Sequence, residues 1–211
     1  MATTQKAPDD AGVGPKPRGS YAKSESTRAA ILDAALEVFA QGGYHVGSLR
    51  EIATKVGISE AGLLHHFTSK ARLLEAVLAR RDQLAAQFVP PHPGDGVRAM
   101  SGLIELAQYN ACVPGVTELY CMLSAEATAP THPAHAYFVR RYEQTRATLV
   151  EAFSNLAARG LLRENVTPAS AARSTIAMMD GLQVQWLLDR SVLDMAEELR
   201  DHLRSVTLVE V

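Results

Sequence analysis

The chain has 211 residues, which suits one compact unit joined to a larger one. Because 47% of the residues are hydrophobic, each unit can bury a core. No apolar run approaches the ~18 residues of a membrane span, and no basic-then-apolar signal opens the chain, so we expect a cytoplasmic protein with no membrane partner. Residues 1–81 carry 11 Lys and Arg against 8 Asp and Glu, and residues 82–211 carry 10 against 15. This asymmetry indicates that the front of the chain meets an anion, although solvated faces would also produce it.

Residues 1–23 contain several Pro and Gly and almost no large apolar side chain, which predicts a disordered basic arm. Its Lys16, Arg18 and Lys23 either touch a phosphate backbone or only solubilise the tail. Proline is absent from Arg18 to Val89 and then recurs at intervals. Because proline ends helices and alternating strand patterns are scarce, the sequence predicts an all-α fold.

The first predicted helix covers about 26–41, where Ile31, Ala35 and Phe39 form an apolar stripe, and Gly42-Gly43 ends it. The second begins at Ser48, which with Glu51 forms a capping box, and ends at Gly57. Serines also precede the third and fourth helices, predicted at 59–67 and about 70–88.

Five further helices follow, at 95–111, 115–128, 133–159, 168–189 and 194–206. Thr167-Pro168 is a helix-start signal, and Asp194 with Glu197 repeats the capping-box pattern. The total is about nine helices.

The segment "SLREIATKVGISEAGLLHHF" (48–67) has a steric reason for each residue type. Ala53 is small where two helices would cross, and Gly57 follows a helix end, where a left-handed conformation is required. Ile58 and Leu63 would fill the corner. Together they predict a helix-turn-helix within a DNA-binding domain at 24–70, followed by a larger domain at 71–211.

The second helix of such a pair usually enters the major groove, and helix starts favour phosphate. The candidate DNA contacts lie on that helix and at nearby helix starts: Thr27, Arg28, Ser48, Arg50, Ser59, Glu60, Ala61, Gly62, Leu64, His65, His66 and Lys70. Glu60 would accept from a cytosine amino group or point into solvent, and Arg50 and Lys70 are alternatively plain exposed charges.

The segment Thr27–Leu74 resembles the DNA-binding domain of TetR-family transcriptional regulators, through "GGY", "SLREIA", "VGIS" and "HHF" followed by "SK". The chain departs from that family at three places. Gly47 stands where threonine is frequent, Ala61-Gly62 where glycine and threonine are frequent, and Leu64 where a tyrosine often touches phosphate. The last departure removes one expected backbone contact and leaves the packing intact.

The resemblance implies that the larger domain senses a ligand and dimerises. Helix 168–189 is apolar on more than one face, which fits a cavity wall plus a partner surface, or plain core packing. The last helix adds an apolar stripe that would suit a four-helix interface. The candidate interface residues are Gln183, Leu187, Leu199 and Leu203.

Candidate ligand contacts are adaptable or amphipathic side chains in this domain: Leu103, Leu106, Tyr109, Tyr120, Met122, Tyr142, Met178 and Trp186. Each is alternatively a core residue. His132 and His135 lack further ligands for a metal, and Cys112 and Cys121 read as reduced small hydrophobes, so we expect no metal and no cofactor.

These patterns favour a homodimeric repressor that reads a palindromic operator in double-stranded DNA and is released by a small lipophilic effector. A ligand-independent DNA-binding regulator is the alternative. An all-α enzyme is disfavoured, because the sequence shows no catalytic triad, phosphate loop or paired carboxylates, and we predict no catalytic residues.

Overall fold

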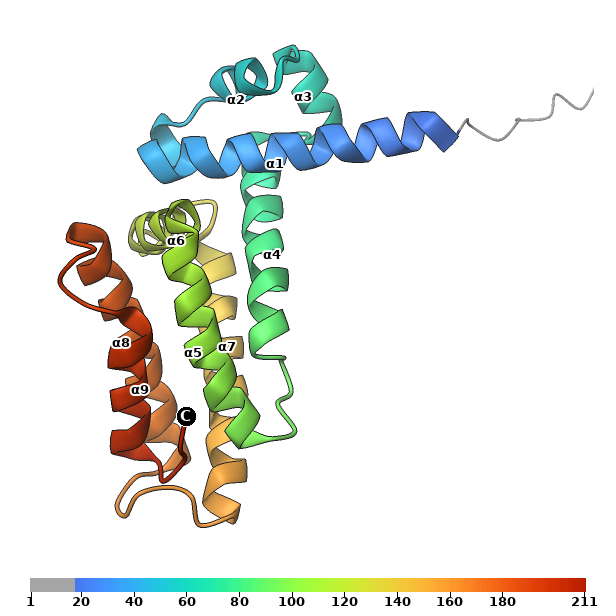
Figure 1. The fold of residues 1–211 in the computed structure, drawn as a ribbon. Helices are drawn as coiled ribbons and strands as arrows, with labels where there is room; N and C mark the ends of the chain where they lie inside the picture. Colours follow the sequence, from blue (N-terminus) through green and yellow to red (C-terminus); the bar gives the residue numbers. More distant parts are fainter. Residues whose placement is uncertain (1–17) are drawn as a thin grey trace, which may run out of the picture.

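The computed structural model describes residues 18–211, which form nine α-helices, so the predicted all-α class is confirmed (Figure 1). The helices are α1 (Arg18–Val46), α2 (Leu49–Val56), α3 (Glu60–His66), α4 (Lys70–Phe88), α5 (Gly96–Cys112), α6 (Pro114–Glu126), α7 (His135–Ala158), α8 (Pro168–Leu188) and α9 (Met195–Val206). None of these helices is both long enough and apolar enough to cross a bilayer. Residues 1–17 of the predicted arm, with Lys16, lie outside the described residues.

The first helix begins earlier than the sequence predicted. It begins at Arg18, so the predicted arm ends too late and Lys23 lies on a helix. Residues 22–26 are exposed but rich in good helix formers, and the helix needs no buried stripe there. At the other end, Gly43 adopts φ 69° and ψ −176°, which are not helical, so the regular helix stops at Gly42-Gly43 as predicted and a short helical turn follows the kink up to Val46. A Cβ at Gly43 would lie 2.2 Å from a carboxylate oxygen of Glu126, so this approach also requires glycine.

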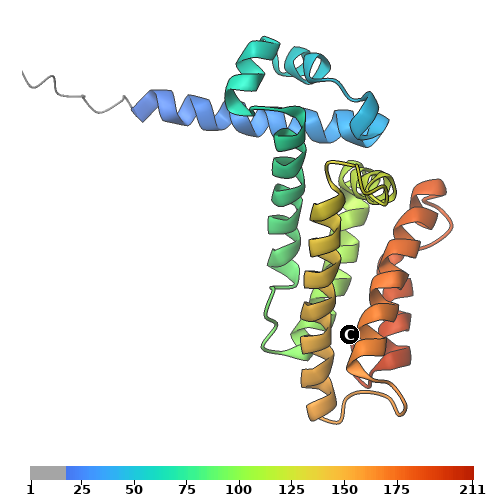
Figure 2. The same cartoon turned by 180° about the vertical axis from the view of Figure 1, so that it is seen from behind.

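Two views show how the helices are arranged. Helix α1 lies across one end of the molecule with α2 and α3 on its outer side, and α4 runs from there along the bundle (Figures 1 and 2). Helices α5, α7, α8 and α9 form that bundle. Helix α6 lies between the bundle and α1, against which it packs.

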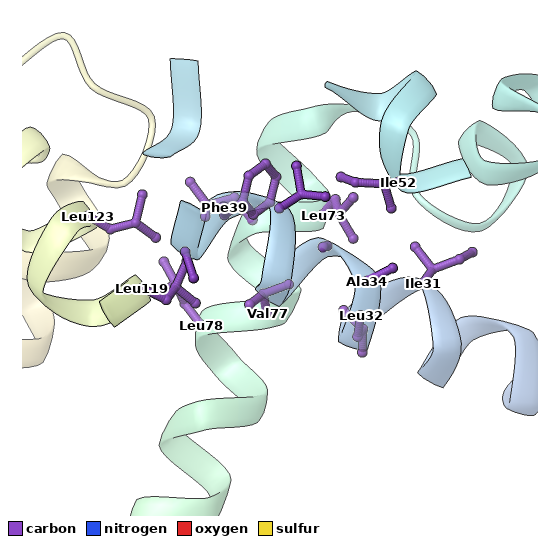
Figure 3. Close-up of a cluster of buried hydrophobic side chains, with 14 of the residues drawn as sticks. Ile31, Leu32, Ala34, Phe39, Ile52, Leu73, Val77, Leu78, Leu119 and Leu123 are labelled. Carbon is purple, nitrogen blue, oxygen red and sulfur yellow. The ribbon is translucent and has the colours of Figure 1, made fainter. Parts of the chain in front are cut away.

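The chain buries two hydrophobic cores. The first joins α1–α4 to α6, and Figure 3 shows Phe39, Ile52, Leu73 and Leu123 within it. The second fills the bundle of α5, α7, α8 and α9. Because α4 and α6 complete the first core, packing continues across the predicted domain boundary at residue 70.

Candidate nucleic-acid interface and ligand cavity

The turn between α2 and α3 has the geometry that the sequence predicted. Gly57 is left-handed, with φ 75° and ψ 29°, and its N–H donates to the carbonyl of Thr54 at 3.1 Å. The N–H of Ile58 donates to the carbonyl of Ala53 at 3.0 Å, which completes a Schellman motif. Ala53 itself is buried. Ser48 accepts from the N–H of Glu51 at 3.1 Å, whereas the described residues show no return bond from the Glu51 side chain.

Helix α3 divides into a buried face and an outer face. Ser59 caps its start by accepting from the N–H of Gly62 at 3.0 Å. Leu63 is fully buried and anchors the helix, together with Phe67 just after its end. The outer face consists of predicted DNA-contact residues that are exposed: Glu60, Ala61, Leu64 and His65. The buried side chains thus hold a short helix from one side, and its outer face presents one carboxylate together with small, apolar and imidazole side chains.

The flanking predicted contacts are placed differently from one another. Arg50 is exposed on α2, and the exposed Arg28 holds its guanidinium 4.7 Å from the ring centroid of Phe67. Both cations therefore border the α2–α3 unit. Thr27 donates to the carbonyl of Lys23 within α1. Lys70 points toward the end of α1, where it contacts Tyr44 and His45.

Four side chains connect the α1–α4 unit to α6 and the segment that follows. Lys70 Nζ lies 4.6 Å from the Tyr44 ring centroid and donates to the carbonyl of His45 at 3.3 Å, and desolvation lowers its pKa. Glu126 accepts from the N–H of Tyr44 at 3.1 Å and lies 3.4 Å from Nε2 of His132. Burial lowers the pKa of His132. These contacts join α6 and the segment that follows it to the end of α1.

A cavity of about 450 Å³ lies between α4, α5, α6, α7 and α8. Volumes of ~300–1,000 Å³ are typical of small-molecule sites. Of the predicted ligand contacts, Leu103, Leu106, Tyr120 and Tyr142 line it. Four others lie elsewhere: Tyr109 contacts Phe88 with tilted rings, Met122 approaches Gly43, Met178 packs against the second core and Trp186 lies within it. The same residue types at the same helical spacing occur in the core and in the cavity wall, so the sequence does not distinguish the two locations.

Sequence reasoning missed the charged groups of the cavity wall. Asp82 accepts from the Tyr137 hydroxyl at 2.6 Å and pairs with Arg141 at 2.9 Å. Asp180 accepts from the Tyr142 hydroxyl at 2.8 Å, and burial raises its pKa. The sequence did contain a signal for them, because these charged residues stand at helix positions where the apolar stripe would place hydrophobic residues.

Arg81 belongs to the same group of missed residues. It is 8% exposed, and its guanidinium carbon lies 3.9 Å from the Tyr120 ring centroid. Burial and the neighbouring Arg141 lower the pKa of Arg81. The cavity thus combines an apolar wall with a buried polar network.

The predicted interface residues fall into two groups. Leu199 and Leu203 are 1% and 0% exposed, so they are core residues with no surface left for a partner. Gln183 is also buried and lines the cavity, while Leu187 is half-buried. The exposed apolar side chains near the end of α8 are instead Val184, Leu188 and Val192.

The histidines and cysteines examined for metal chemistry have other partners. His132 Nδ1 accepts from the N–H of Ala134, and His135 Nδ1 lies 2.8 Å from the carbonyl of Ala127. Burial raises the pKa of the Cys121 thiol to about 11, and Cys112 is exposed. Within residues 18–211 no three potential ligands gather at one place.

Comparisons with known proteins match both halves of the chain. Residues 31–77 match the family model "Bacterial regulatory proteins, tetR family", and residues 117–207 match "BetI-type transcriptional repressor, C-terminal". The first match contains the α2–turn–α3 unit, and the second spans α7 to α9 with most of α6.

Individual relatives agree with these matches. The chain is 42% identical over 74 residues to the HTH-type transcriptional regulator SrpR of Pseudomonas putida, covering 35% of each chain. It is 37% identical over 73 residues to UidR of Escherichia coli K12, covering 34% of this chain and 37% of UidR. The match thus spans about a third of these curated relatives.

A solved structure extends the likeness to nearly the whole fold. The crystal structure of NalD, the secondary repressor of the MexAB-OprM multidrug efflux pump in Pseudomonas aeruginosa, superposes with a TM-score of 0.69 at 25% identity. The superposition covers 88% of this chain and 98% of NalD. With its left-handed turn at Gly57, its outward α3 and these matches in both halves, the chain belongs to the TetR family of DNA-binding transcriptional regulators.

Proposed function

We propose that the protein is a homodimeric repressor that binds a near-palindromic operator and leaves it when a small, mostly apolar molecule enters the cavity. The proposal rests on the position of α4, which contributes side chains both to the first core and to the cavity wall. Its Leu73, Leu74 and Val77 belong to the core that holds α3, whereas Arg81 and Ala85 line the cavity. One helix therefore touches both the support of the reading helix and the space for a ligand.

The reading of DNA is assigned to the outer face of α3. Ala61 and Leu64 would meet base edges and thymine methyl groups, and His65 a base edge or phosphate. Arg28 and Arg50 border this face and would bind phosphates. Two such helices, related by a two-fold axis, would enter successive major grooves. We place the axis near the end of α8, where Val184, Leu188 and Val192 are exposed apolar residues that a second copy would cover.

Release follows from differential affinity. A ligand shifts the dimer only if it binds one arrangement of α4 and α6 more tightly than the other. A cavity reached by both helices provides such a difference, because filling it resists their closure onto α7 and α8. This cavity favours a ligand-responsive regulator over a ligand-independent one. Repression, rather than activation, is supported by the likeness to NalD.

The test begins with selection of bound DNA from a random pool by the full chain, followed by titration of the selected duplex. Ala61→Leu adds bulk to the outer face of α3 and should weaken binding at least about tenfold, since one lost base contact costs ~1–3 kcal/mol. Ala157→Leu is the matched control, because Ala157 is exposed near the far end of α7. Equal operator affinity for both variants and the wild type would contradict the assignment.

Two further measurements separate the parts of the proposal. Arg50→Ala should reduce the slope of log affinity against log salt by about one phosphate contact. A reporter downstream of the selected operator should become more active when the protein is removed, and a fall in activity would indicate an activator. Sedimentation of Leu188→Arg should show loss of the dimer if the α8 surface forms the interface.

A further inference from the structure

The cavity wall contains a buried cationic donor that the protein itself does not satisfy. Arg81 is 8% exposed, and its Nη1 has no hydrogen-bond partner within the described part of the chain. The Oδ1 atom of Asp82 lies 3.8 Å from that nitrogen, which is too far for a hydrogen bond. A buried charged donor without an acceptor is strongly unfavourable, so its retention at a cavity wall calls for an explanation.

The other charged groups of the wall are only partly satisfied, because Oδ1 of Asp82 lies 2.9 Å from Nη1 of Arg141 but has no hydrogen-bond partner within the described residues. Asp82 is held by Arg141 and the Tyr137 hydroxyl, and Asp180 accepts from the Tyr142 hydroxyl. Arg141 has a second buried donor, Nε, without a partner over residues 18–211. Two buried guanidinium nitrogens, Arg81 Nη1 and Arg141 Nε, thus lack an acceptor, whereas one buried carboxylate oxygen, Asp82 Oδ1, lacks a donor. The wall also contains Glu151, which lies 3.3 Å from Nδ1 of His92. Burial also raises the pKa of Asp180.

The rest of the wall is mainly apolar. Leu103, Leu106, Ile176 and Met179 come from α5 and α8, and Ala85 from α4. These side chains would pack on a hydrocarbon or aromatic body, while neutral polar groups are added to the wall by Gln144, Thr145, Thr148 and Gln183. A ligand that satisfies the whole cavity therefore needs an apolar body with one strong acceptor at the end near α4.

We propose that the cavity binds an amphipathic organic acid, whose carboxylate accepts hydrogen bonds from Arg81 and whose apolar body packs on Leu103, Ile176 and Met179. The inference rests on the proposed function only in treating this acid as the effector. The charge-assisted bond to the guanidinium selects the acid over its neutral and cationic analogues. A cationic analogue leaves Arg81 Nη1 buried and unsatisfied, whereas a neutral hydroxyl accepts only a weaker hydrogen bond than a carboxylate does.

The first experiment compares three probes with the same hydrocarbon chain: decanoate, decanol and decyltrimethylammonium. Each is titrated calorimetrically, below its aggregation concentration, into the full-length protein without DNA. The proposal expects decanoate to bind at least about tenfold more tightly than decanol, with decyltrimethylammonium weakest. Equal or tighter binding of decanol or decyltrimethylammonium would overturn it.

The second experiment replaces the donor. Arg81→Met should weaken decanoate about 10- to 100-fold and leave decanol within about threefold of wild type, because only the charge-assisted bond is lost. Arg80→Met is the matched control, since Arg80 is the preceding residue on α4, pairs with Asp33 at 2.8 Å and does not line the cavity. Undiminished decanoate binding by Arg81→Met would also overturn the proposal.

Thermal unfolding of each variant checks that it folds. If Arg81→Met does not fold, Arg81→Lys keeps the charge but not the planar fork, and it should retain a preference for decanoate that is smaller than in the wild type. Binding is then repeated with the selected operator present. Decanoate binding without DNA release would refute the effector role in the proposed function while leaving the acid site standing, and release by decanol alone would refute the acid site.

Discussion

The two halves of the molecule bury different kinds of side chain. Between residues 22 and 80 every buried residue is hydrophobic or glycine. All the buried polar and charged residues of the described chain come later: Arg81, Asn110, Thr117, His132, Thr175, Gln183 and Thr207. A close-packed apolar core has one arrangement, whereas buried polar groups with incomplete partners allow others. The α1–α4 unit thus closes around apolar side chains, whereas the half with the cavity contains buried polar groups that lack full partners.

The largest expected effect tests the rigidity of the first core. Phe39 is 0% exposed and packs among residues of α2, α4 and α6. Phe39→Ala should lower the free energy of unfolding by about 3–5 kcal/mol, through lost transfer energy and an unfilled cavity. Urea unfolding at fixed protein concentration measures it. Val46→Ala, at a position that is 78% exposed, should change stability by less than about 0.5 kcal/mol. A loss below about 1 kcal/mol for Phe39→Ala would mean that this core relaxes.

A smaller loss of stability is expected when a partly buried ion pair is broken, and a smaller one still for an exposed pair. Asp82→Asn removes the charge that faces Arg141 in the cavity wall and should cost about 1–3 kcal/mol, because a partly buried cation loses its counter-charge. Asp33→Asn breaks the exposed pair with Arg80 and should cost about 0–1 kcal/mol. Calorimetric unfolding of both variants at neutral pH gives the difference. Equal losses would remove the distinction between the cavity network and surface charge.

The turn of the reading unit provides the next test. Gly57→Ala should cost about 1–2 kcal/mol, because φ 75° is unfavourable for a residue with a Cβ, while no atom lies within 4 Å of the added methyl. Gly57→Asn should cost less, since asparagine tolerates the left-handed region. Gly94→Ala serves as the control, because its φ lies outside the strained range and its surroundings are also open. A Gly57→Ala variant as stable as the control would show that the turn adapts.

The smallest effect concerns the junction at Glu126. Burial lowers the pKa of His132 below its ordinary value of 6.5, so the folded state keeps the neutral imidazole, although Glu126 opposes the shift. The unfolded chain then binds more protons, and the contribution of His132 is present above about pH 6.5 and is lost as the pH falls. His132→Gln should flatten the fall in melting temperature between about pH 7.5 and 5.5. His92→Gln, at an exposed position, should not.

Sequence reasoning was accurate where one local requirement decides the structure. The turn at Gly57, the buried Ala53 and the start of α4 at Lys70 follow from backbone conformation, side-chain size and capping, all of which act within a few residues. It was wrong at the start of α1, because a helix of exposed good formers needs no apolar stripe. The capping box at Ser48 was half right, since only the serine bond forms.

It was least informative about the cavity. Tyr120 and Tyr142 line it while Tyr109 and Trp186 do not, and no spacing distinguishes them. Leu199 and Leu203 have the stripe of an interface helix, yet they are buried within their own chain. An amphipathic stripe indicates that one face of a helix is buried, but it does not indicate whether the same chain or a partner subunit covers that face.

By itself the sequence determined the helices, the left-handed turn and the outward reading helix, because capping, proline, glycine and apolar periodicity are short-range causes. The tertiary structure alone decided which side chains enclose the cavity and that Arg81 is buried there without an acceptor. Those outcomes depend on how α4 to α8 pack across distant parts of the chain, and packing is a property of all the helices together.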